Sequence, residues 1–164
     1  MKKLIASVLL SMCIAGGAFA QQAAPAPSAQ QQARPSPQDV DPNSMVMAAL
    51  QAAQLVDGGR AGEIWDGSSA IAKGAITKDA FVKAIAAARN PLGQPVSRVW
   101  LSVIRQSVPA PQAGQAAPAG SPPPGNYISV RFATRFSGGR TVAELVTFRL
   151  EDNGTWRVAG YTLQ

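Results

Sequence analysis

The spacing of apolar residues changes once along the chain, from helical spacing before residue 90 to strict alternation from Pro95 onward. Asp41 followed by Pro42 indicates a helix start, and Gly58-Gly59 ends this helix after Asp57. A short second helix is predicted over residues 60–65, and Thr77 caps a third that ends at the sequence Asn-Pro-Leu-Gly at 90–93. From these helices we expect the core to receive Leu50, Trp65, Phe81 and Ile85.

Four strands are predicted in the second half of the chain. In the first, Val99, Leu101 and Val103 alternate with polar residues. An uncharged stretch rich in Pro, Gly and Ala, residues 109–125, is expected to form a long mobile loop, and further strands are predicted over 127–136, 141–151 and 155–163. Helices followed by strands predict an α+β domain, with N-terminal helices packed on a curved four-stranded antiparallel sheet.

The turns between the last three strands predict their register. A three- or five-residue loop after Phe136 aligns Val130 with Val146 or Phe148, whereas a two-residue loop would turn one strand's apolar face outward. The sequence Asp-Asn-Gly at 152–154, as a three-residue loop, aligns Leu150 with Trp156. The predicted core face of the sheet comprises Ile128, Val130, Phe132, Phe136, Val142, Val146, Phe148, Leu150, Trp156 and Val158.

The first 40 residues predict an export signal followed by a disordered tether. Two lysines, an apolar run and a small-x-small site at 18–20 predict a secretory signal peptide over residues 1–20, cleaved after Ala20. A lipoprotein signal at Cys13 is the alternative, but Met12 is bulky for that site. Residues 21–40, rich in Gln, Ala and Pro, are expected to form a disordered tether. The single domain then spans residues 41–164, and we expect a periplasmic or secreted protein with no transmembrane segment.

Composition excludes several chemistries. Without residues 1–20 the chain keeps 13 basic and 9 acidic side chains, a net charge of +4, and it has no Cys and no His. Zinc sites of Cys or His, haem ligation, disulfides, and Ser-His-Asp or Cys-His catalysis are therefore not available. No carboxylates are paired for acid-base work, and no basic run suggests nucleic-acid binding. We predict no enzymatic activity, no catalytic residues, no cofactor and no metal.

Several short motifs resemble one bacterial family. They are the sequences Asp-Gly-Gly-Arg at 57–60 and Leu-Gly at 92–93, the alternating residues of 127–136, and, most specifically, Gly-Thr-Trp-Arg-Val-Ala-Gly-Tyr at 154–161. The chain thus resembles the exported proteins grouped as domain of unknown function 4019, from about residue 45 to its end. The resemblance implies a secreted α+β domain with a cone-shaped fold like that of nuclear transport factor two. It implies no activity.

Glu144 is the least expected residue of the predicted core face. A buried carboxylate needs a partner or a raised pKa. The simpler interpretation is that Glu144 pairs with an arginine or a helix N-terminus and serves the fold. The other is a polar anchor for a small apolar ligand held between helices and sheet.

Arginine and tyrosine side chains are predicted to gather on the opposite face of the sheet. Arginine suits carboxylate or phosphate groups, and the two residue types together are typical of recognition surfaces. The simpler alternative is a solvated sheet face. The candidate partner-binding residues are Tyr127, Arg131, Arg135, Arg149, Arg157 and Tyr161.

Two functions follow from these observations. The first is a non-catalytic protein-interaction module that binds another envelope protein, such as an inhibitor or immunity protein. The alternative is a small apolar ligand-binding domain with Glu144 as its anchor. The sequence leaves the oligomeric state open.

Overall fold

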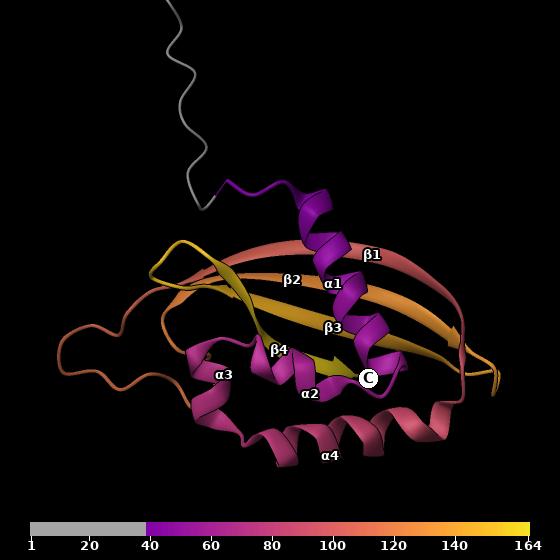
Figure 1. The fold of residues 1–164 in the computed structure, drawn as a ribbon. Coiled ribbons are helices and arrows are strands. Elements are labelled where there is room, and N and C mark those ends of the chain that lie inside the picture. The colour runs from indigo at the N-terminus through magenta and orange to yellow at the C-terminus, as the bar shows by residue number, and fades with distance from the viewer. Residues whose placement is uncertain (1–38) are drawn as a thin grey trace, which may run out of the picture. The chain divides into compact units, whose positions relative to one another are not determined.

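Four helices precede a four-stranded sheet in the computed structural model, which describes residues 39–164 (Figure 1). The predicted signal peptide and most of the predicted tether lie outside the described residues. The helices are α1 (Pro42–Asp57), α2 (Ala61–Asp66), α3 (Ala70–Ala75) and α4 (Lys78–Arg89), followed by a 3-10 turn, η1 (Asn90–Leu92). The strands are β1 (Pro95–Val108), β2 (Gly125–Phe136), β3 (Thr141–Leu150) and β4 (Trp156–Leu163). The predicted α+β class is confirmed.

Short polar side chains begin three of the helices. A carboxylate oxygen of Asp41 accepts a hydrogen bond from the backbone N–H of Asn43 at 3.1 Å, and Thr77 accepts one from Ala80 at 3.3 Å. Both start sites were predicted. Ser69 caps α3 in the same way, a six-residue helix that the sequence pattern did not indicate. Each cap satisfies a backbone donor that the helix itself leaves free.

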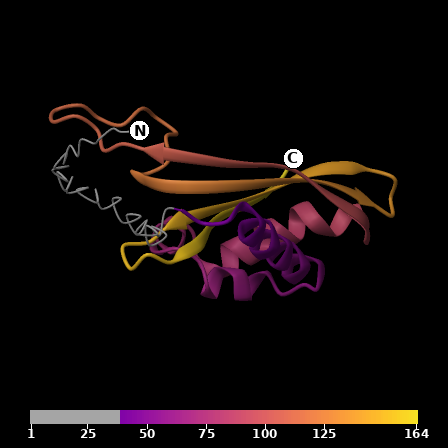
Figure 2. The same cartoon turned by 90° about the horizontal axis from the view of Figure 1, so that it is seen from above.

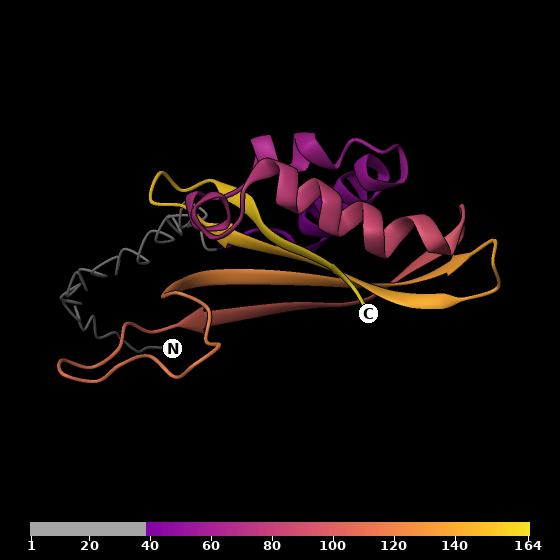
Figure 3. The same cartoon turned by 90° about the horizontal axis from the view of Figure 1, so that it is seen from below.

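The sheet is an antiparallel meander in the order β1-β2-β3-β4. Val130 faces Val146, and Leu150 faces Trp156, so the predicted register of both hairpins is confirmed. The helices cover one face of the sheet, and no other described element lies over the opposite face, which we call the outer face (Figures 2 and 3). The core between helices and sheet contains most of the predicted residues, with Ile85, Val130, Phe132, Val146 and Phe148 buried and Leu50, Phe81, Trp156 and Val158 half-buried against them. Val40, placed in the tether by its sequence, also packs on this core.

Bulges in β1 and β4 change which face a side chain points to. In β4, Phe148 pairs with Val158 but Thr147 pairs with Gly160, so Ala159 is an extra residue. The predicted alternation of faces along the last strand is therefore wrong after Val158, and Tyr161 lies on the core face. In β1, Leu101 is the extra residue between Trp100, which pairs with Phe132, and Ser102, which pairs with Arg131. A bulge shifts the alternation by one residue, and sequence alternation alone does not reveal it.

The predicted apolar face of β1 differs from the structure. Val99 and Leu101 are more than half exposed, and Arg98 points to the helix side in their place. Arg98 points inward because it forms ion pairs with the carboxylates of Asp57 and Glu144 in the core.

Candidate functional site

Glu144 lies at the centre of a buried polar cluster. Its side chain is fully buried, at 0% exposure. Arg98 donates two hydrogen bonds to the carboxylate, from Nε to Oε2 at 2.5 Å and from Nη2 to Oε1 at 3.2 Å. The hydroxyl of Tyr161 donates to Oε1 at 2.8 Å, and the hydroxyl of Thr134 donates to Oε2. Four donors thus occupy the roughly four acceptor positions that a carboxylate offers.

Asp57, the last residue of α1, extends this cluster toward the helices. Its Oδ2 accepts a hydrogen bond from Arg98 Nη2 at 3.0 Å, and its Oδ1 accepts from Arg89 Nη2 at 2.9 Å. Arg89 also donates to the backbone oxygen of Gly93 at 2.5 Å, and its guanidinium lies 4.6 Å from the ring centre of Phe136. The four charges alternate in sign along the series Arg89, Asp57, Arg98, Glu144, which we call the buried ion network.

The buried ion network favours the charged forms of Glu144 and Arg98. Burial raises the pKa of the Glu144 carboxyl. The hydrogen bonds from Arg98, Thr134 and Tyr161 and the charge of Arg98 lower it by more than burial raises it, so the pKa lies below its ordinary value. For Arg98, burial lowers the pKa, and the bonds and charges of Glu144 and Asp57 raise it above the ordinary value. Burial and the neighbouring Glu144 charge raise the pKa of the Tyr161 phenol, which stays protonated.

These contacts favour the structural interpretation of Glu144. A carboxylate whose acceptor positions are all taken by protein donors has none free for a ligand. A catalytic acid or base needs a proton that a substrate can reach, and Glu144 is buried and ionised. The buried ion network connects the ends of α1 and α4 to β1 and β3. The role of Glu144 as a ligand anchor stays a prediction.

The six predicted partner-binding residues do not form one surface. Tyr161 is buried in the core and hydrogen-bonded to Glu144, because the bulge at Ala159 turns it to the helix side. Arg131 and Arg135 are exposed on the outer face of β2. Arg157 is exposed on the edge strand β4, where its Nη1 donates to the backbone oxygen of Gly67 at 3.4 Å.

Tyr127 and Arg149 lie on the outer face but are held by the end of the Pro-rich loop. The hydroxyl of Tyr127 donates to the backbone oxygen of Pro123 at 2.7 Å, and the residue is buried. Arg149 donates to the backbone oxygen of Pro124 at 3.2 Å and pairs with Glu151 at 3.3 Å. Both side chains therefore anchor the loop that precedes β2, and Arg131 and Arg135 remain as the exposed cations of this face.

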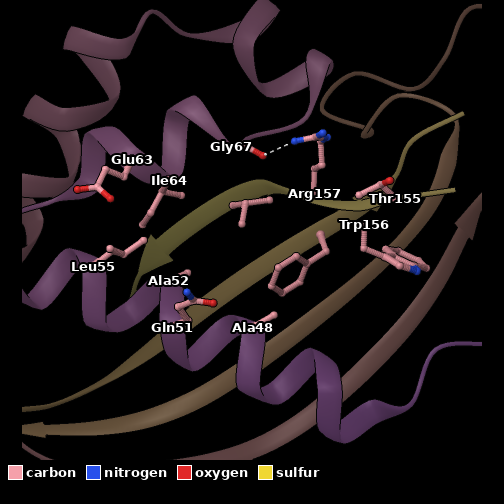
Figure 4. Close-up of a pocket in the computed structure, with 12 residues that line it drawn as sticks. Ala48, Gln51, Ala52, Leu55, Glu63, Ile64, Gly67, Thr155, Trp156 and Arg157 are labelled. Atoms are coloured by element: carbon pink, nitrogen blue, oxygen red, sulfur yellow. Dashed lines mark hydrogen bonds between the residues drawn. The ribbon is translucent and has the colours of Figure 1, made fainter. Parts of the chain in front are cut away.

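A shallow groove lies between α1, α2 and β4 (Figure 4). Its volume is about 280 Å³. Ala48, Ala52 and Leu55 of α1 line one side, and Trp156 and Arg157 of β4 lie on the other. The lining is mainly apolar and does not include Glu144.

Five of the six large apolar residues that are exposed among residues 39–164 lie on β1, and the sixth is Met47 of α1. Val96, Val99, Trp100, Leu101 and Ile104 are each between 55% and 64% exposed. Four of the five follow one another within six positions of one strand, and this strand is an edge of the sheet. The sequence does hold a signal for this surface: the first strand of a meander is an edge strand, and β1 carries no acidic residue.

Arg98 was the other residue that sequence reasoning missed. A partner for Glu144 was expected, either an arginine or a helix N-terminus, but seven arginines follow residue 90 and the pattern did not select among them. Among the described residues, no group of three or more acidic residues forms a metal site. No helix within residues 39–164 has the length and apolar character needed to cross a membrane.

The fold and its features define a small α+β domain with a buried ion network and an exposed apolar edge strand. The family model described as "Protein of unknown function (DUF4019)" matches residues 48–161. The chain therefore belongs to this family, as its sequence motifs indicated. Searches of curated proteins and of solved structures gave no match.

Proposed function

We propose that this protein is a non-catalytic interaction module of the bacterial envelope that binds an acidic partner protein through β1 and the neighbouring part of β2. The single observation that carries the proposal is that five exposed apolar side chains lie along the edge strand β1, with Val99 and Ile104 on its outer face and Trp100 on the helix side. Exposed apolar residues concentrated on one strand of a small domain are typical of an interaction site. Scattered apolar residues would need no such explanation.

The charge of β1 and β2 indicates which charge the partner carries. β1 and β2 together carry Arg98, Arg105, Arg131 and Arg135 and no Asp or Glu. Arg98 is neutralised in the buried ion network, whereas the other three are exposed. Arg131 and Arg135 lie on the outer face and Arg105 on the helix side, so both sides of this edge complement a partner with apolar and acidic residues.

The proposed setting follows from the predicted signal peptide. Cleavage after Ala20 would release the chain into the periplasm or the medium, where its partner would be another envelope protein. A small domain without Cys, His or an accessible acid-base pair fits the class of inhibitor or immunity proteins, which act by covering a partner. We also propose that the helices and curved sheet form a cone like that of nuclear transport factor two, because all four helices lie on one face of the sheet.

A pull-down experiment tests the proposal. The full mature chain would capture partners from an envelope extract of the source bacterium, beside a face variant, Val99→Ser/Ile104→Ser/Arg131→Ala/Arg135→Ala. The matched control, Met47→Ser/Lys83→Ala, removes an exposed apolar residue and a cation from the helix side.

We expect wild type and control to capture the same acidic protein and the face variant to lose it. The captured amount should also fall with rising salt, because exposed charges are screened. Equal capture by all three proteins, or loss of a partner that is not acidic, would show that this surface is not the binding site.

A further inference from the structure

We infer that the partner binds as an added strand: an extended segment with alternating apolar and acidic side chains hydrogen-bonds to the free backbone edge of β1. The inference rests on the proposed function and adds the form of the partner and the atoms that hold it. Its first support is the topology. β1 is a 14-residue strand that pairs with β2 on one side, and within the described residues no strand pairs with its other side.

The two edges of the sheet differ in a way that points to β1. At β4 the connection between α2 and α3 occupies the outer edge: the backbone N–H of Ser69 donates to the oxygen of Val158 at 2.8 Å, and Arg157 reaches Gly67. Proteins usually protect exposed edges by such covering, by short strands, or by charged residues and prolines. β1 has its only proline at its first position, is long and mainly apolar, and pairs with no described strand along its free edge.

The bulge at Leu101 limits the added strand to one part of β1. From Ser102 to Val108 the pairing with β2 runs without interruption. Seven residues in unbroken register offer alternate N–H and C=O groups along the edge, enough for a strand of ordinary length. The exposed side chains of Trp100 and Leu101 lie at one end of this segment and extend the apolar contact.

The side chains along 102–108 specify the sequence of the partner segment. Ile104 is paired with Ser129 on the outer face, so it favours an apolar neighbour there. Arg105 lies on the helix side, half-exposed, with its nearest carboxylate that of Asp39 at 3.9 Å. An acidic side chain beside Arg105 would form a cross-strand pair of opposite charge. Alternation of apolar and acidic residues places each kind on its own face.

The same residues disfavour a second copy of this chain as the added strand. Two-fold antiparallel pairing of 102–108 would place Arg105 directly opposite its own copy. Like charges opposite each other destabilise a sheet, and β1 holds no acidic residue to offset them.

The test uses synthetic peptides with the full mature chain. The probe is a fluorescein-labelled, end-capped eight-residue peptide of alternating Val and Glu, and its binding is followed by fluorescence anisotropy. A Val-Lys peptide of the same length controls for charge. Two further Val-Glu peptides are N-methylated, one at every Val and one at every Glu, so that each has lost the N–H groups of one backbone edge.

We expect saturable binding of the Val-Glu peptide and none of the Val-Lys peptide. Ile104→Ser should weaken binding about tenfold, and Arg105→Glu should exchange the preference toward the Val-Lys peptide. Met47→Ser, at an equally exposed apolar residue of α1, should bind as wild type does. At least one N-methylated peptide should bind about tenfold more weakly than its parent.

Each contrary result has a distinct meaning. If both N-methylated peptides bind as well as their parent, strand addition is wrong and side-chain binding at β1 stands. If the Val-Glu peptide does not bind while the pull-down still depends on the face variant, the inference fails and the proposed function survives. If neither depends on β1, both fail. A dimer in analytical ultracentrifugation that Ile104→Ser abolishes would make a second copy the occupant and overturn the inference.

Discussion

Substitution of Glu144 by glutamine is the most direct test of the buried ion network. The side chain keeps its shape but loses its charge, and the amide can replace only one of two acceptor oxygens. Arg98 then remains buried with Asp57 as its single carboxylate partner. Removal of one member of a buried ion pair lowers the free energy of unfolding by about 3 to 5 kcal/mol. Because Asp57 still compensates Arg98, we expect the lower end, about 3 kcal/mol.

The pH dependence separates this electrostatic effect from a packing defect. The pKa of Glu144 is lower in the folded chain than its ordinary value, so ionised Glu144 stabilises the fold above its unfolded-state pKa of about 4.3. This stabilisation is lost as the pH falls through the folded-state pKa. Protonated Glu resembles Gln, so the difference between wild type and Glu144→Gln should be full at pH 7 and shrink below about pH 4.3.

Urea unfolding followed by tryptophan fluorescence at several pH values measures this difference. For a domain of this size, about 3 kcal/mol corresponds to a melting temperature lower by roughly 12 °C. Glu63→Gln is the matched control, because Glu63 pairs with Arg60 at 2.6 Å on the surface, where solvent screens the pair. A difference below about 1 kcal/mol at pH 7, or one that does not change with pH, would refute the electrostatic reasoning.

Three further predictions concern single contacts. Tyr161→Phe should lower the free energy of unfolding by about 2 kcal/mol, since it removes a hydrogen bond to a buried charge, and a double-mutant cycle with Glu144→Gln should show that the two effects are not additive. Val99→Ser should change stability by less than about 0.5 kcal/mol in thermal unfolding because the side chain is exposed, and a larger loss would mean that Val99 is packed. Arg149→Met should speed amide hydrogen exchange at Gly125 and Asn126, next to the point where the arginine holds the loop at Pro124, and unchanged exchange would show that other contacts suffice.

The hairpins and helix starts could be predicted because they are local. The alternation around the turn at residues 137–140 selects one register, and a slip by one residue would expose an entire apolar row. Caps such as Thr77 depend on a side chain and a backbone group three residues apart.

The parts that could not be predicted depend on distant residues or on small irregularities. Arg98 and Glu144 are 46 residues apart, and no local pattern joins them. A single extra residue at Ala159 moved Tyr161 from the expected binding face into the core, where it supports Glu144. Likewise, Val99 follows the pattern of a buried strand although its strand is an edge with no described neighbour on one side.

The contact between Ser69 and Val158 has a consequence for assembly. A sheet with two open edges can pass strand pairing from one molecule to the next and grow into fibres, as head-to-tail contacts do when they do not close. Here the connection after α2 terminates the sheet at β4, so growth by strand addition ends after one partner. With one open strand edge per molecule, the proposed strand addition cannot continue from copy to copy into a fibre.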